Sequence, residues 1–326
     1  SEMCIRDSFF PEAQAAGWSL FHHDMGLDHL YFGSKRATDS QMAEAAAADA
    51  ELAILIEGHS SDDDRLSTLL KAGHALRATA TYAGPMDFGK DFDEISIQDY
   101  NAAADLAPDY LTKEGFGALV ARFGAGVPVD LGAPVHRIDW SGKGVTVESA
   151  KGTARARAVV VTVSTGVLAF EDIRFAPALP DGHMEAIFDL PMGLLTKIPV
   201  EIRGDRLGLA AFDDLLIERH ARHDVYFLCF PFDLDLMVGF VGGDFAWEME
   251  AAGSEAAVDF VTDRLVDIFG SDLRGKVGRS LMTNWGGERF TRGAYAAARP
   301  GKAQARATLA EPVGARIWFA GEALAG

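Results

Sequence analysis

The sequence contains little that would place the protein in a membrane or an oxidising compartment. Only two cysteines occur, Cys4 and Cys229, so there is no disulfide framework and no paired-thiol metal site. No apolar run approaches the roughly 18 residues that a transmembrane helix needs. No basic stretch followed by an apolar one marks a signal peptide. The expected location is the reducing cytoplasm.

Basic residues are also scarce. Lys and Arg total 30 against 48 Asp and Glu, which gives a formal net charge of −18 at pH 7. Such an acidic chain, without a basic stripe, is poorly suited to bind nucleic acid or an anionic membrane surface. The composition is otherwise that of a globular protein, 48% hydrophobic and 24% charged. The acidity favours solubility and the attraction of cationic substrates.

Neither end of the chain looks like a natural terminus. Residues 1–8 begin without Met, and they resemble a translated adapter sequence from assembled environmental reads. An ordinary disordered terminus is the alternative interpretation. At the other end, residues 319–326 are a strand-like run followed by small residues that usually lead into a helix. We therefore expect a fragment that is cut at both ends.

The first hundred residues are predicted to be mainly helical. Apolar side chains one helical turn apart predict a helix over residues 39–57. Residues 62–64 are predicted to be a loop and N-cap for a helix over 65–80, which Gly84 and Pro85 should end. A further helix or turn is expected over 96–106.

Strand patterns dominate after about residue 110. Residues 115–123 are predicted to be a short helix, and residues 128–131 a strand that precedes a β-meander over 135–140 and 144–148. The apolar run 158–163 predicts a strand buried on both faces. Further elements are predicted as strands at 197–202, 225–230, 236–241 and 316–320, and as an amphipathic helix at 254–269. The alternation of the two kinds of region indicates two interleaved domains.

A dinucleotide-binding loop needs G-x-G-x-x-G between a strand and a helix. The nearest match is GFGALV at residues 115–120, whose sixth position is Val and which no predicted strand precedes. We therefore do not assign it as a phosphate loop. If a dinucleotide binds, its main phosphate loop is expected upstream of this chain.

A series of short motifs resembles the middle of the flavin-containing amine oxidases, the family of monoamine and polyamine oxidases. Each motif is weak alone, but their order over residues 110–326 is specific, whereas the first hundred residues match loosely. The motifs are KEGFGALV at 113–120, V-x-x-I at 135–138, VVVTV at 159–163, F-x-P-x-LP at 175–180, LPMG at 190–193 with Lys197, NW at 284–285, GAY at 293–295 and FAGEA at 319–323.

The resemblance implies a mixed α/β (α+β) fold. A partial FAD-binding, Rossmann-like domain would be interleaved with a substrate domain of mixed β-sheet and helices. The substrate domain would comprise residues 9–110 and 188–280. The FAD-binding domain would comprise residues 111–187 and 281–326.

Three residues are expected on the substrate side of the flavin. By pattern alone Lys197 would be a strand lysine with its ammonium in solvent, and Trp285 and Tyr295 would be core aromatics. The resemblance implies that Lys197 approaches the flavin N5 through a water and favours the reaction with oxygen. It makes Tyr295 one wall of an aromatic cage that orients the amine, with Trp285 near the flavin ring. The second wall would lie beyond residue 326.

The resemblance also implies a cofactor-binding set. The backbone of Val135 would meet the adenine, and Glu322 would accompany the pyrophosphate and ribitol, together with Thr162 and Gly321. The plain alternatives are a strand valine and a surface glutamate. Family members that bind flavin covalently carry Cys where this chain has Ala294, so the expected FAD is non-covalent.

No metal site is predicted. The histidines at 22, 23 and 29, with Asp24, lack a helical pair and a third ligand. Residues 62–64 are interpreted as a solvated helix cap.

The activity that the resemblance implies is FAD-dependent oxidation of a small amine. Hydride transfer to flavin N5 would give an imine and then a carbonyl compound, and oxygen would be reduced to hydrogen peroxide. One alternative is a related flavoenzyme acting on carbon–carbon bonds, of the desaturase or protoporphyrinogen oxidase type. Another is a non-enzymatic fragment, since we expect this chain alone to bind little or no flavin.

Overall fold

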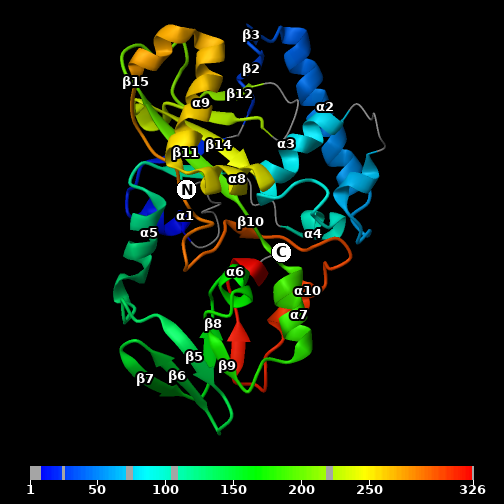
Figure 1. The fold of residues 1–326 in the computed structure, drawn as a ribbon, viewed down its shortest axis with the longest axis vertical. Coiled ribbons are helices and arrows are strands. Elements are labelled where there is room, and N and C mark those ends of the chain that lie inside the picture. Colours follow the sequence, from blue (N-terminus) through cyan, green and yellow to red (C-terminus); the bar gives the residue numbers. More distant parts are fainter. Residues whose placement is uncertain (1–8, 24–25, 71–75, 104–108, 218–222, 325–326) are drawn as a thin grey trace.

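A computed structural model describes residues 9–23, 26–70, 76–103, 109–217 and 223–324. The adapter-like residues 1–8, which include Cys4, lie outside the described residues, as do Asp24 and residues 325–326. The fold is mixed α/β, as predicted. Figure 1 shows an upper region around a seven-stranded sheet and a lower region around smaller sheets.

The N-terminal helices follow their capping signals. Thr38 caps α2 (Asp39–Glu57), because its hydroxyl accepts a hydrogen bond from the Gln41 amide at 3.3 Å and its own amide donates to Gln41 Oε1 at 2.9 Å. This helix has the predicted bounds. The other helices here are α1 (Phe10–Ala15), α3 (Arg77–Phe88) and α4 (Ile97–Ala102).

The helix predicted over residues 65–80 is wrong. A 3₁₀ turn occupies Leu66–Leu69, and α3 begins only at Arg77. Pro85 does not end α3 either, since it lies inside the helix, which stops at Gly89 with φ of +63°. A proline lacks the N–H that would bond to the carbonyl four residues earlier, so Pro85 costs α3 one internal bond without ending it.

Seven strands form the upper sheet in the order β15-β11-β14-β13-β12-β2-β3. Their bounds are β2 (His29–Phe32), β3 (Lys35–Arg36), β11 (Leu195–Ile202), β12 (Asp214–Ile217), β13 (Tyr226–Cys229), β14 (Leu236–Gly242) and β15 (Val277–Ser280). The predicted strands at 197–202, 225–230 and 236–241 are thereby confirmed within a few residues.

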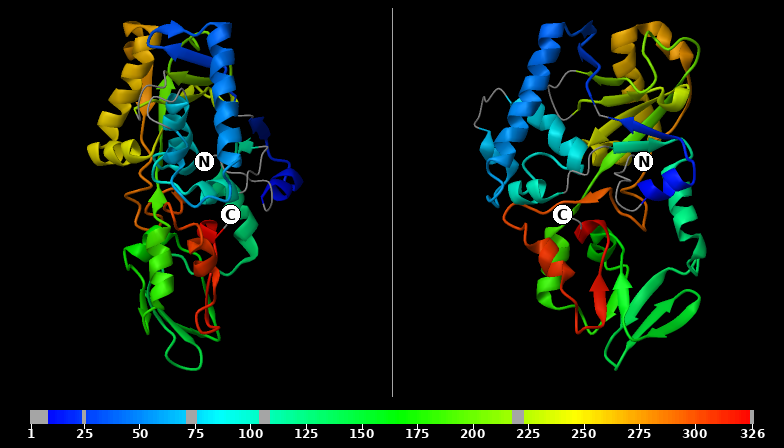
Figure 2. Two further views of the ribbon diagram at one scale, coloured as in Figure 1. Left: turned by 90° about the vertical axis from the view of Figure 1, so that its right-hand side faces the viewer. Right: turned by 180° about the vertical axis from the view of Figure 1, so that it is seen from behind.

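Different helices pack on the two faces of this sheet. Along β11, Ile198, Val200 and Ile202 are buried beneath α8 (Asp244–Ala252) and α9 (Ser254–Phe269), the latter with its predicted bounds. Figure 2 shows these two helices on one side of the sheet and α2 and α3 on the other. The second face carries the inner-face cluster, which consists of Leu30, Leu111, Leu195, Leu216, Tyr226, Leu228 and Phe240.

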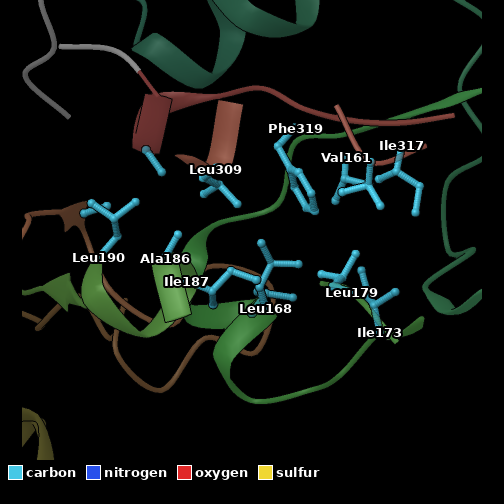
Figure 3. Close-up of a cluster of buried hydrophobic side chains, with 14 of the residues drawn as sticks. Val161, Leu168, Ile173, Leu179, Ala186, Ile187, Leu190, Leu309, Ile317 and Phe319 are labelled. Carbon is cyan, nitrogen blue, oxygen red and sulfur yellow. The ribbon is translucent and has the colours of Figure 1, made fainter. Parts of the chain in front are cut away.

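The lower region combines a four-stranded sheet, a parallel strand pair and three helices. Its core, shown in Figure 3, joins segments far apart in sequence, for example Leu168 and Ile187 with Leu309 and Phe319. The sheet has the order β7-β6-β5-β9, and β8 pairs with β17. The bounds are β5 (Val135–Asp139), β6 (Val145–Ser149), β7 (Gly152–Ala156), β8 (Val159–Val161), β9 (Arg174–Ala176), β17 (Ile317–Phe319), α6 (Thr165–Ala169), α7 (Asp181–Asp189) and α10 (Ala305–Ala310).

Two strand predictions in the lower region fail. Residues 128–131 are not a strand, and Val129 and Leu131 are 63% and 77% exposed. The strand predicted to be buried on both faces has one open face, because Val160 is 60% exposed. Trp318, its neighbour on β17, is 44% exposed. Within the described residues, this face of the β8–β17 pair is therefore open to solvent at Val160 and Trp318.

A strand does precede the glycine-containing stretch at 115–120, contrary to the prediction. It is β4 (Asp109–Thr112), which pairs antiparallel with β1 (Leu20–His23). Gly115, with φ of +89°, then begins α5 (Phe116–Phe123). Since β4 pairs antiparallel, this turn is not the strand–loop–helix unit of a dinucleotide fold.

The two regions meet at a short antiparallel pair, β10 (Met192–Gly193) with β16 (Tyr295–Ala296), at the centre of Figure 1. The end of α3 packs directly on this pair. The Leu194 amide donates to the Gly89 carbonyl at 2.7 Å, and a Cβ on Gly193 would lie 2.8 Å from the same oxygen. Only a glycine permits this approach of two backbones.

Candidate active site

Three of the predicted cofactor residues lie together at one edge of the β8–β17 pair. Thr162 follows β8, and Gly321 and Glu322 follow β17, so all three are at the carboxyl ends of parallel strands. A Cβ on Gly321 would lie 3.4 Å from the Thr162 carbonyl oxygen, and the φ of Gly321 is +120°. In open parallel sheets, ligands bind outside this carboxyl edge. All three residues are exposed there.

Glu322 connects this edge to β16. Its Oε2 accepts a hydrogen bond from the Ala296 amide at 3.1 Å. Desolvation raises the pKa of the carboxyl group, although the Ala296 bond and the charge of Arg306 act in the opposite direction. The side chain nevertheless keeps solvent access. A carboxylate placed in this way can accept hydrogen bonds from hydroxyl groups of a ligand.

Val135 lies apart from this edge. It is the first residue of β5 in the four-stranded sheet and packs against the lower core. The structure therefore brings together three of the four predicted cofactor residues and puts the fourth in a neighbouring sheet.

Tyr295 lies where the upper and lower regions meet. It pairs with Gly193, and the amide of the preceding Ala294 donates to the Gly193 carbonyl at 2.8 Å. The half-buried Tyr295 ring packs against the inner-face cluster. Tyr295 thus contacts the inner-face cluster and directly precedes Ala296, whose amide donates to Glu322.

Lys197 lies on the same sheet face as Leu195 of the inner-face cluster. It pairs with Phe240 of β14, and its Nζ is 5.0 Å from the centre of the Phe240 ring. The Lys197 amide donates to Thr283 Oγ1 at 2.9 Å, and the Thr283 amide donates to the Lys197 carbonyl at 2.9 Å. Lys197 and Tyr295 therefore adjoin one apolar cluster.

Trp285 lies in the loop that runs from Thr283 to Tyr295. Its carbonyl accepts bonds from the Gly293 amide and from Thr291 Oγ1, both at 3.0 Å. Its side chain is 42% exposed, which is unusual for a residue of this size and leaves it open to a ligand. The same loop thus joins Lys197 to Tyr295 through Trp285.

Glu250 of α8 fixes this loop and was missed by the sequence reasoning. Its Oε2 accepts from the Gly286 amide at 2.9 Å, and its Oε1 accepts from Thr196 Oγ1 at 3.0 Å. Desolvation raises the pKa of Glu250, and the bonds from Thr196 and Gly286 partly offset that effect. Its partners lie 36 and 54 positions away, so no local motif signals the contact.

A second missed residue, Arg292, holds the segment that precedes Tyr295. Its guanidinium donates to Asp172 Oδ2 from Nε at 2.9 Å and from Nη2 at 2.7 Å. It also stacks on Phe170, with Cζ 3.9 Å from the ring centre. Both partners belong to the lower region, so the loop is tied to both halves of the molecule.

Two of the three histidines considered for a metal, His23 and His29, lie beside carboxylates. His23 Nε2 lies 3.0 Å from Asp214 Oδ1, and His29 Nε2 lies 2.7 Å from Asp213 Oδ2. Over the described residues no cluster of three or more His, Cys, Asp or Glu side chains is arranged to hold a metal. In the same part of the chain, no helix has the length and apolar character needed to cross a membrane.

Comparison with known proteins decides the family. The sequence model of the flavin containing amine oxidoreductases matches residues 11–326. The chain belongs to this family. It is 31% identical over 221 residues to "Lysine-specific histone demethylase 1 homolog 1" of Oryza sativa subsp. japonica, a match that covers 64% of this chain and 26% of that protein.

Other members of the family are similar over comparable or longer spans. "Polyamine oxidase 4" of Oryza sativa subsp. japonica is 29% identical over 242 residues, which are 72% of this chain and 49% of that protein. The chain therefore spans about half or less of the length of these curated relatives. The solved structure of cyclohexylamine oxidase from Brevibacterium oxydans IH-35A shares the fold, with a TM-score of 0.75 at 21% identity, and covers 96% of this chain and 79% of that one.

Membership of the family implies a flavin cofactor, and the geometry fits part of such a group. Gly321 has no side chain where the two strands end, which leaves that edge open to a ligand. Glu322 stands beside it as an acceptor, and Trp285 offers an open aromatic surface.

Proposed function

We propose that this chain forms the substrate-binding part and a portion of the cofactor-binding part of an FAD-dependent amine oxidase. The observation that carries the proposal is that Lys197 and Tyr295 adjoin one apolar cluster while β16 is bonded to Glu322 at the carboxyl edge. Bound FAD would accept a hydride from the carbon beside the amine nitrogen and pass the electrons to oxygen, which yields peroxide.

The chain's own residues would hold FAD without a covalent bond. Gly321 and Thr162 would let the cofactor approach the strand ends, and Glu322 would accept hydrogen bonds from its hydroxyl groups. Ala294 has no thiol to form a thioether. We expect that acid denaturation of the holoenzyme, meaning an FAD-loaded protein that contains this chain, releases all of its flavin into the supernatant. Yellow colour that stays in the washed precipitate would contradict non-covalent binding.

The inner-face cluster would favour the neutral form of the substrate amine. A small amine that enters an apolar site loses hydration, which lowers its pKa and favours the neutral form that can lose a hydride. Tyr295 would present its ring to this amine and restrict its orientation. The aliphatic part of the substrate would pack against the side chains around Phe240. Small amines and oxygen are therefore the proposed partners.

Lys197 would act on the reaction with oxygen. Its Nζ lies on the same side of the sheet as the proposed amine site, and a fixed cation there stabilises negative charge that develops as oxygen is reduced. We expect Lys197→Met to slow reoxidation of the reduced holoenzyme by about a hundredfold to a thousandfold, the range of one lost electrostatic contact.

The test combines a substrate screen with stopped-flow spectroscopy. Primary monoamines, diamines, polyamines and N-methylated lysine peptides are mixed with the holoenzyme without oxygen, and bleaching of the flavin is recorded. Oxygen is then added, and reoxidation and peroxide are followed. Lys143→Met serves as a matched control, because Lys143 is an exposed turn residue of the lower region. Absence of bleaching by every amine would overturn the function, and unchanged reoxidation in Lys197→Met would overturn the role of Lys197.

A further inference from the structure

The outer edge of β16 is completed by two side chains of opposite charge. One edge of this two-residue strand pairs with β10. On the other edge, Glu322 Oε2 accepts from the Ala296 amide at 3.1 Å, and Arg306 Nη2 donates to the Ala296 carbonyl at 2.8 Å. Both hydrogen-bonding groups of the residue after Tyr295 are thus bound by charged side chains.

Arg306 is itself fixed by a buried carboxylate. Its Nε and Nη2 donate to Asp99 Oδ1 and Oδ2 at 2.6 and 2.9 Å, and its Nη1 donates to the Ala323 carbonyl at 2.9 Å. The Asp99 side chain is 1% exposed and that of Arg306 12%. Hydrogen bonds to charged groups are the stronger ones in proteins, and the paired geometry also fixes the plane of the guanidinium.

Asp99 extends the same network along the chain. Its Oδ2 also accepts from the Ala298 amide at 2.7 Å, and the Ser96 amide donates to the Ala298 carbonyl at 3.0 Å. Helix α4 and its cap therefore bind Ala298, while Arg306 and Glu322 bind Ala296. Hydrogen bonds at Ala296 and Ala298 therefore hold the segment directly after Tyr295, which belongs to no larger sheet in the described part of the chain.

We propose that Arg306, oriented by Asp99, is a positioning residue that sets the place of the Tyr295 ring against the inner-face cluster. The inference rests on the role proposed for Tyr295 above. Four of the contacts of Arg306 come from three different nitrogens, a fork that a lysine ammonium cannot reproduce from a single nitrogen. A lysine at this position keeps the charge and loses the geometry, which makes it the informative substitution.

The experiment reads the environment of Tyr295 directly. The full chain, which contains six tyrosines, is labelled with 3-fluorotyrosine, and its ¹⁹F spectrum is assigned at this position with Tyr295→Phe. The variants are Arg306→Lys and Asp99→Asn. The matched control is Arg316→Lys, because Arg316 Nη1 also donates to a backbone carbonyl, that of Trp140 at 2.6 Å, but in the lower region.

We expect both test variants to shift or broaden the Tyr295 resonance and to leave in place those of Tyr31 and Tyr110, which pack against other clusters. We also expect the Ala298 amide to exchange with solvent about tenfold faster or more in Asp99→Asn, because that amide donates to Asp99 Oδ2 and loses its charged acceptor. The control should change neither. Asp99→Asn, which keeps the size and shape of the side chain, decides the question if Arg306→Lys does not fold.

Two outcomes would overturn the proposal. An unmoved Tyr295 resonance in a folded variant would show that the ring does not depend on the fork. Equal changes in all tyrosine resonances would show a general loss of structure rather than positioning. Neither the ¹⁹F spectrum nor amide exchange needs FAD or turnover. An unmoved Tyr295 resonance would therefore not refute the proposed oxidase activity, and a negative amine screen would not refute the positioning of Tyr295 by Arg306.

Discussion

Gly193→Ala should be among the most damaging single-methyl changes in the protein. The added Cβ would lie 2.8 Å from the Gly89 carbonyl oxygen and 2.9 Å from its carbon, and closer still to the Phe88 oxygen, whereas ordinary contacts begin near 3.4 Å. These neighbours are backbone atoms, so rotation of a side chain cannot relieve the overlap. Overpacking costs about 1–3 kcal/mol and occasionally more, and we expect at least about 3 kcal/mol here.

The assay is equilibrium unfolding in urea, followed by circular dichroism. With a slope of about 3 kcal/mol per molar urea, a loss of this size lowers the midpoint by about 1 M. Gly117→Ala is the matched control, because nothing lies within 4 Å of its Cβ position near the start of α5. Alanine is the better helix former, so the control should gain up to about 1 kcal/mol. If Gly193→Ala unfolds at the wild-type urea concentration, the close packing of α3 on β10 is refuted.

Two further predictions concern ionisable groups. Burial raises the pKa of the Cys229 thiol far above its ordinary value, so in a Cys4→Ser background the native protein should not react with Ellman's reagent at pH 8. Rapid labelling before unfolding would contradict this burial. Hydrogen bonds from Ser141 lower the pKa of Asp139 to about 2, and its stabilising effect is therefore present above the ordinary carboxyl pKa and lost as the pH falls toward 2. Ser141→Ala removes the hydroxyl bond but keeps those from Arg137 and from the amide of residue 141, so an NMR titration should show a pKa of Asp139 above 2 and still below its ordinary value. An unchanged pKa would refute the assignment.

Local signals allowed part of the fold to be predicted. Helices α2 and α9 were predicted with their observed bounds, because helical periodicity extends along each. The predictions failed where contacts between residues distant in sequence determine the bounds or the burial of an element. Pro85 lies inside α3, and Val160, in a strand predicted to be buried on both faces, is 60% exposed. Neither result can be inferred from neighbouring residues.

The candidate site, like the fold, could be predicted only in part from the sequence. Lys197, Tyr295 and Glu322 were found through a resemblance in motif order, and the structure places them around β16 and the inner-face cluster; their roles stay predictions. The residues that hold them were not found. Arg306 reaches Asp99 over 207 positions, and Glu250 reaches Gly286 over 36. Pairs of this kind have no local pattern, because the fold alone brings them together.

The interleaved path of the chain has a consequence for how the protein is made. The lower core combines side chains from residues 138–192 with others from 296–324, and β8 has β17 as its partner. During synthesis the first of these segments leaves the ribosome long before the second. The apolar side of β8 then stays exposed while the upper sheet is completed. Pairing of β8 with β17 closes a large loop of the chain, which is slow. Newly made chains should therefore depend on chaperones until residues 296–324 emerge.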